Sequence, residues 1–185
     1  MQNIQALPTG REDSAPRTWR LSYEQIAYVV LAVLALVFYL VALDVAPLNE
    51  GEARAALAAY HYVYPSALGE RLVAPSPLLF LAQSTAFSLI GSVEFAARVG
   101  TALAGALLVL SPVLFRRALG VERALLLSVL LLGSPVILIS SRASSPALWS
   151  ALLAALTLWA GWRWWVERRE RHAILLLTFL AGLIF

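Results

Sequence analysis

Long apolar runs, with little amphipathic periodicity between them, dominate the pattern of hydrophobic and polar positions along this chain. Four of these runs hold 17 to 20 residues each, at positions 26–45, 96–115, 124–140 and 146–162. A helix of about 20 residues rises about 30 Å, the hydrocarbon thickness of a bilayer. The pattern predicts an all-α polytopic membrane protein with about four complete transmembrane helices. Pro112 and Pro135 follow serines inside these runs, where kinks are expected.

Two shorter apolar runs need a separate assignment. Pro77–Ile90 has 14 residues and carries polar side chains such as Gln83 and Ser84. Residues 173–185 give roughly 20 Å of helix, too little to cross a bilayer. This last run predicts a partial fifth span in a C-terminally incomplete fold, so that either the natural protein continues beyond Phe185 or a partner holds the segment.

Composition agrees with a membrane location. Of 185 residues, 61% are hydrophobic and 14% are charged, which is more apolar surface than a soluble domain of this size could bury. All 14 basic residues are arginines that flank the apolar runs, a distribution that argues against nucleic acid as a partner. The sequence has no cysteine, which excludes disulfides and thiolate metal sites, and its two histidines are too few for a histidine-rich site.

The first 22 residues differ from the rest of the chain. They contain two prolines, one glycine and scattered charges, the composition of a disordered tail. A full-length apolar run follows them directly, without a short apolar stretch and a cleavage site, so they are not read as a signal peptide. We therefore expect a disordered cytoplasmic tail at 1–22 and a transmembrane region at 23–185.

The arginines also predict an orientation. They gather before the first long run and in two turns, around Arg116 and around Arg168, and the positive-inside rule makes all three clusters cytoplasmic. An even number of crossings must then separate the tail from the first of these turns. Pro77–Ile90, the shortest and most polar run, is therefore assigned to a juxtamembrane helix at the outer interface. Residues 46–95 become one external loop with its own helices, in a multi-pass protein of the inner (plasma) membrane.

The external loop opens with charged residues that could carry chemistry. Glu50, Glu52 and Arg54 fall just outside the membrane, where acids could handle a divalent metal or a phosphate-bearing head group. The competing interpretation is structural. Asn49 followed three residues later by Glu52 is a helix N-terminal capping signature, and the helix dipole favours acids there.

Two further residues are candidates for substrate binding. His61 stands among Tyr60, Tyr62 and Tyr64, an aromatic cluster that serves either as an interfacial belt or as a substrate platform. Arg142 lies at the outer end of the third long run. Its fixed charge could meet a lipid phosphate or cap the C-terminus of a helix.

Three stretches of the sequence resemble a known family. They are GEARAALAAYHYVYP, SPLLFLAQSTAFSLIGSVEFAARVGTALAGALL and LFRRALGVERALLLSVLLLGSPVILISSRASSPALW. Their order and spacing are similar to the N-terminal part of the membrane glycosyltransferases with the C-type fold, above all the protein mannosyltransferase-like branch. The resemblance covers about residues 43–165. It implies juxtamembrane helices in the first external loop, and transfer of a sugar from a polyprenyl-phosphate donor to an acceptor at the outer face.

The sequence departs from the acidic motifs of that family. The loop usually begins with an Asp-Glu pair, in which the Asp acts as a base or as a metal-site acid. Glu52 matches the Glu, but Gly51 occupies the Asp position, and Glu50 is displaced by one residue. Such a displacement on an ordered segment redirects the side chain.

A second acid normally follows the Ser-Arg pair in the next external loop. Here Ser141-Arg142 is followed by residues 143–146, which contain no acid. Ser145 and Pro146 instead predict the N-cap and the first residue of the fourth span. Loss of such a carboxylate generally costs orders of magnitude in rate.

Two functional hypotheses follow. The first is a glycosyltransferase in which Glu50 or Glu52 is the catalytic acid, with Arg54, His61 or Arg142 binding a lipid-linked sugar; family analogy permits a divalent metal, although no cofactor is predicted. The second is a non-catalytic homologue, retained as an accessory or scaffold subunit of a larger membrane complex. Membrane lipids are partners under both hypotheses. A polyprenyl-phosphate sugar belongs to the first, and other membrane subunits belong to the second.

Overall fold

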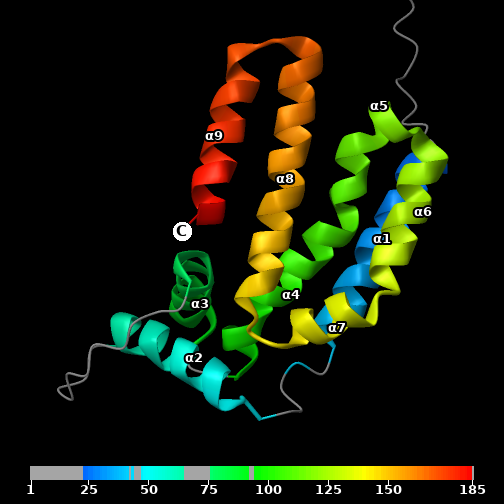
Figure 1. Ribbon diagram of the computed structural model, residues 1–185. Coiled ribbons are helices and arrows are strands. Elements are labelled where there is room, and N and C mark those ends of the chain that lie inside the picture. Colours follow the sequence, from blue (N-terminus) through cyan, green and yellow to red (C-terminus); the bar gives the residue numbers. More distant parts are fainter. Residues whose placement is uncertain (1–22, 42, 44–46, 65–75, 92–93, 185) are drawn as a thin grey trace, which may run out of the picture.

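The structure, a computed structural model, describes residues 23–41, 43, 47–64, 76–91 and 94–184. In chain order its elements are α1 (Tyr23–Leu40), α2 (Glu50–Val63), α3 (Pro77–Ile90), α4 (Glu94–Leu110), the 3-10 helix η1 (Ser111–Phe115), α5 (Arg116–Leu119), α6 (Val121–Leu132), α7 (Pro135–Arg142), α8 (Pro146–Glu167) and α9 (Glu170–Ile184). The described part contains no strand, so the predicted all-α class is confirmed there (Figure 1). The predicted disordered tail at 1–22 lies outside the described residues.

Few of the described helices meet the requirements of a membrane span. Two are long and apolar enough, α1 with 18 residues and the stretch Glu94–Leu119 with 26 residues, which α4, η1 and α5 form together. The pair α6 and α7 would make a third if both belong to one bent span. These helices point to membrane association, whereas the predicted four complete spans with a partial fifth are not confirmed.

The predicted and observed numbers of candidate spans differ because of the helices after α5. The apolar run at 124–140 is divided into α6 and α7, of 12 and 8 residues. α8 has the length of a span at 22 residues, but tryptophans and Arg163 make it less apolar than α1. α9 has 15 residues, or about 22 Å of helix, and is too short to cross.

α3 has the bounds expected from the sequence, Pro77–Ile90, and with 14 residues it is too short to span a bilayer. It packs against α2 and α4. Figure 1 shows α2 and α3 together at the end of the molecule opposite α5. The assignment of α3 to the outer membrane interface stays a prediction.

α4 is the central helix of the fold, packed against α1, α3, α7 and α8 (Figure 1). Its buried side chains are mostly small, including Ala102, Ala104 and Ala106. Small residues let helix backbones approach closely where packing rather than water exclusion drives association. Two approaches are especially close. A Cβ atom at Gly105 would lie 2.9 Å from the Cβ of Ser141 in α7, and one at Gly100 would lie 2.9 Å from the Cβ of Ala82 in α3.

Serine-proline pairs interrupt the helices at the predicted positions. Pro112 lies in η1, where the Ser111 hydroxyl donates to the Leu108 carbonyl at 2.7 Å. Pro135 begins α7, and the axes of α6 and α7 differ by 57°. The expected kink is confirmed at Pro135, whereas at Pro112 the α-helix changes to a 3-10 helix within the continuous stretch Glu94–Leu119. A proline has this effect because it removes a helical N–H and its ring crowds the preceding turn.

The turn between α8 and α9 is held by an ionic group. Glu167 accepts from Arg163 Nη2 at 2.7 Å and lies 2.9 Å from His172 Nε2. Arg168 ends α8 in the left-handed backbone conformation, with φ 52°, and the chain reverses direction there. The hydrogen bond to His172, assisted by the charges of Arg163, His172 and Arg169, lowers the pKa of Glu167 below its ordinary value.

The close approach at Gly105 generates a prediction. Gly105→Ala should lower the free energy of unfolding by about 1–3 kcal/mol, because the added methyl group overpacks the contact with Ser141. Thermal unfolding of the purified protein in a lipid-like detergent measures this. Gly161→Ala is the matched control, since its Cβ would make an ordinary 3.5 Å contact with Leu176. Partial rescue by Ser141→Gly is expected, and a Gly105→Ala protein as stable as the parent would contradict the close packing.

The lowered pKa of Glu167 generates a prediction about pH. Because the folded protein holds this proton less tightly than the unfolded chain, ionised Glu167 stabilises the turn above the ordinary pKa of 4.5. That stabilisation is lost as the pH falls through the lowered folded value. The parent protein should therefore melt higher than Glu167→Gln at neutral pH, and the difference should disappear once the pH has fallen through the lowered folded pKa of Glu167. A difference in melting temperature that is independent of pH would contradict this role.

Candidate functional site

Asn49 and Glu52 exchange two hydrogen bonds at the start of α2. Asn49 is the N-cap residue, and its Oδ1 accepts from the Glu52 backbone N–H at 2.9 Å. Its Nδ2 donates back to Glu52 Oε1 at 3.1 Å. The capping interpretation of this segment is therefore confirmed. The hydrogen bond from Asn49 Nδ2 is a local contact that orients the Glu52 side chain.

The second carboxylate oxygen of Glu52 is bound by an arginine that is distant in the sequence. Arg98 in α4 donates to Glu52 Oε2 from Nη2 at 2.7 Å and from Nε at 3.3 Å. Both residues are buried, with 6% of Glu52 and 4% of Arg98 exposed. Arg98 also donates to the carbonyls of Leu43, at 2.7 Å, and Pro47, at 3.0 Å. One guanidinium thus joins α4, the start of α2 and the segment that follows α1.

A cavity of about 420 Å³ lies beside this ion pair, and we call it the α2/α8 cavity. It is lined by Asn49, Gly51, Glu52 and Ala55 of the α2 region, by Leu79 of α3, and by residues 143–146 before and at the start of α8. The structure therefore brings together the two segments in which the family resemblance places its acids.

The far wall of the α2/α8 cavity is fixed by hydrogen bonds to one carbonyl. The hydroxyl of Ser144 donates to the Ala97 carbonyl at 3.0 Å, and Gln83 Nε2 donates to the same oxygen at 3.1 Å. Ser145 and Pro146 take the predicted N-cap and first helical positions of α8, although the Ser145 side chain makes no capping hydrogen bond. The Oε1 of Gln83 is buried without a hydrogen-bond partner among the described residues.

The acid content of the α2/α8 cavity is small. Among the residues that the structure describes there, Glu52 is the sole carboxylate, and both of its oxygens accept hydrogen bonds from Arg98 and Asn49. Within the described part of the chain, no three His, Cys, Asp or Glu residues are grouped to hold a metal ion. A proton transfer through Glu52 would first have to break its contacts with Arg98.

The other predicted site residues lie elsewhere. Glu50 and Arg54 form an exposed ion pair one turn apart on α2, with 81% and 74% of their side chains exposed. His61 is half-buried in the last turn of α2, its ring 6.1 Å from that of Tyr60. Neither the pair nor His61 lines the α2/α8 cavity.

Arg142 caps a helix. It is exposed at the end of α7, and its Nη2 donates to the Phe38 carbonyl at 3.2 Å, in the last turn of α1. Of the two roles open for this residue, the contact with a helix C-terminus is the one observed.

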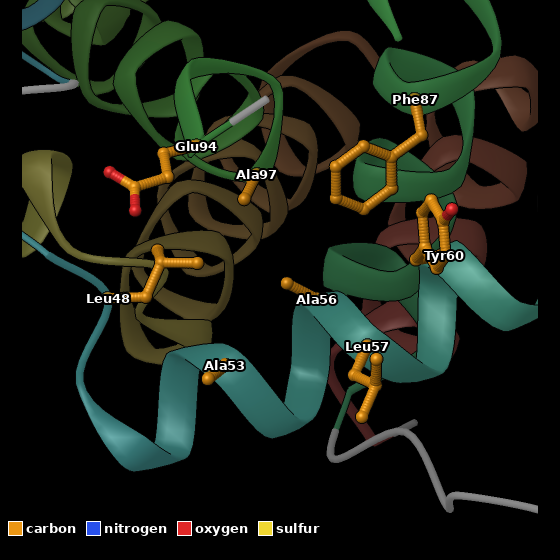
Figure 2. Close-up of a pocket in the computed structure, with 8 residues that line it drawn as sticks. All are labelled: Leu48, Ala53, Ala56, Leu57, Tyr60, Phe87, Glu94 and Ala97. Atoms are coloured by element: carbon orange, nitrogen blue, oxygen red, sulfur yellow. The ribbon is translucent and has the colours of Figure 1, made fainter. Parts of the chain in front are cut away.

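A smaller hollow of about 230 Å³ lies between α2, α3 and α4. Figure 2 shows apolar side chains around it, with Leu57 and Tyr60 from α2, Phe87 from α3 and Ala97 from α4, and the Glu94 carboxylate at one end. The rings of Tyr60 and Phe87 meet edge to face at 6.2 Å between centroids. The tyrosines near His61 thus belong partly to the packing between α2 and α3.

In the part of the chain that the structure describes, fold and site define a helical protein with two or three candidate membrane spans and one acid, already paired, in the α2/α8 cavity. Comparison of the chain with protein-family models, with curated proteins and with solved structures found no match. The resemblance to C-type glycosyltransferases therefore remains a prediction from the sequence.

The Glu52–Arg98 pair generates a prediction. Glu52→Gln should lower the free energy of unfolding by about 3 kcal/mol, because it leaves the Arg98 charge buried without its carboxylate. Arg98→Gln should cost a similar amount, and the double variant should cost less than the sum of the two. Thermal unfolding of the purified protein measures all three.

The exposed pair on α2 supplies the matched control. Glu50→Gln removes an acid two residues away and should change stability by less than about 1 kcal/mol, as is usual for exposed ion pairs. Equal stabilities of Glu52→Gln and Glu50→Gln would contradict a structural role for the buried pair.

Proposed function

We propose that this chain is a multi-pass protein of the inner (plasma) membrane with a cytoplasmic N-terminus. We further propose that it is a non-catalytic homologue of the C-type glycosyltransferases, and that it acts as an accessory or scaffold subunit of a larger membrane complex. The α2/α8 cavity would then face outward, at the place where the active enzymes handle lipid-linked sugar. The arginines around Arg116 and Arg168 support this orientation.

The state of Glu52 carries the proposal. A general base or a metal ligand needs carboxylate lone pairs that can turn to a substrate or an ion. In Glu52, Arg98 occupies Oε2 and Asn49 occupies Oε1, and the residue is almost fully buried. An ion pair of this kind stabilises a fold, and its rearrangement in each catalytic cycle would leave a buried charge without its partner.

The composition of the cavity walls gives further support. Gly51 has no side chain where the resemblance expects an acid, and residues 143–146 supply hydroxyl and backbone groups in place of a second acid. Glu50, the nearest replacement, points its carboxylate to Arg54 on the exposed side of α2. No pair of carboxylates on separate segments therefore faces the cavity among the described residues.

One observation favours the catalytic alternative. The α2/α8 cavity has about 420 Å³, within the range of small-molecule sites, and it lies between the two segments that the family resemblance singles out. In an active enzyme Glu50 or Glu52 would be the acid, Arg142 would meet the donor phosphate, and a divalent metal would be allowed by analogy. This alternative requires that donor binding release Glu52 from Arg98.

The proposal predicts that the 185-residue chain transfers no sugar by itself. The test is to reconstitute it in liposomes and to assay it with polyprenyl-phosphate-linked hexoses, several acceptors and added divalent cations. We expect no turnover, together with a stable complex with other membrane proteins when the chain is purified from its native membrane.

Two variants sharpen this assay. Turnover by the parent chain that Glu52→Gln abolishes and Glu50→Gln preserves would overturn the proposal in favour of the enzyme. The second variant, Gly51→Asp combined with Ser145→Asp, places two acids at the cavity. Gly51 has room for the side chain, since its Cβ would lie 3.4 Å from Asn49 Oδ1, and Asp is a good N-cap residue at 145. Turnover gained by this variant alone would identify the missing acids as the cause of inactivity.

A further inference from the structure

A second hollow lies at the end of the molecule opposite α2 and α3, and we call it the arginine hollow. It has a volume of about 340 Å³ and is lined by Val113, Leu114, Arg116, Arg117, Trp159 and Arg163. Its walls come from η1 and α5 on one side and from α8 on the other, and η1 and α8 are in contact. Figure 1 shows α5 near the end of the molecule where α8 turns into α9.

The arginine hollow carries an excess of positive charge. Arg116 pairs with Glu24 at 2.9 Å and Arg163 pairs with Glu167 at 2.7 Å, whereas Arg117 has no partner among the described residues. Three guanidinium groups thus face two carboxylates. The Nε of Arg163 is buried without a hydrogen-bond partner in the described part of the chain, so its donors are not all used by the protein. One added negative charge would balance the group.

The position of the arginine hollow indicates which kind of ligand supplies the negative charge. Trp159 lines it, and its ring lies 6.0 Å from the Arg163 guanidinium. Trp162, Trp164 and Trp165 follow on the same end of α8. Tryptophans mark the depth of the membrane interface, which is the depth of phospholipid phosphates. Val113 and Leu114 add an apolar wall, and Val166 is exposed one turn beyond Arg163 on α8.

We propose that the arginine hollow is a binding site for the phosphate group of an anionic phospholipid. A phosphodiester carries one negative charge, which matches the excess of the hollow, and guanidinium groups bind phosphate oxygens through paired N–H donors. The lipid tails lie along the apolar surface of α8 and η1. Basic pockets between membrane helices bind lipid head groups in this way. The site is separate from the α2/α8 cavity and does not depend on sugar transfer.

The test is native mass spectrometry of the full chain in a mild detergent, titrated with phosphatidylglycerol or with zwitterionic phosphatidylcholine. We expect one phosphatidylglycerol to be retained per chain in preference to phosphatidylcholine. Arg117→Gln, which breaks no observed contact, should weaken phosphatidylglycerol binding about fivefold. Arg123→Gln is the matched control, because it removes the same charge from α6 outside the hollow and should leave binding unchanged.

Three results would overturn the proposal. Equal binding of the two lipids would show that charge does not select the ligand. Equal losses in Arg117→Gln and Arg123→Gln would show a diffuse attraction in place of a site. Displacement of the lipid by inorganic phosphate at millimolar concentration would identify a soluble phosphate as the ligand. Circular dichroism and melting temperature confirm that each variant is folded, so that a lost site is distinguished from a lost fold.

Discussion

The burial of one charge pair organises the connection between α1, α2 and α4. A guanidinium removed from water is costly unless its charge and its N–H groups are matched. Arg98 meets this requirement with a carboxylate from Glu52 and with backbone carbonyls from Leu43 and Pro47. Through these contacts Arg98 ties Leu43 and Pro47 to the start of α2 and to α4. The walls of the α2/α8 cavity depend on it directly.

The rest of the fold depends on close packing around α4. Its alanines and glycines let α1, α3, α7 and α8 approach it together, and at Gly105 the contact leaves no space for a methyl group. Residues 143–146 connect α7 to α8, and both of these helices pack against α4. This packing holds the connection next to α2, across the α2/α8 cavity. The cavity is therefore a consequence of helix packing as well as of the ion pair.

Local features were predictable from the sequence because their causes are local. The spacing of Asn49 and Glu52 predicts the N-cap of α2, and the serine-proline pairs predict breaks in the helices. The ion pair was not predictable in this way, since 46 positions separate Glu52 from Arg98 and nothing near either residue identifies its partner. The charge of Arg98 within an apolar run was the available signal, because such a charge needs a partner. The number of spans is not confirmed, and a run of apolar residues does not show that the chain bends by 57° between α6 and α7, where Pro135 begins α7.

The tryptophans of α8, which are the fluorescent side chains of this helix, are unevenly distributed between its two ends. Four of the five indoles in this helix, from Trp159 to Trp165, belong to its basic end, and Trp149 stands near the other end. Intrinsic fluorescence of the described region is therefore dominated by the arginine-rich end, and its quenching by brominated lipids measures the depth of that end in a bilayer. Trp149, whose ring approaches Gly100 of α4, would report on the packing of α8 against α4 once the other indoles have been replaced by phenylalanine. The same helix can thus report separately on its two ends.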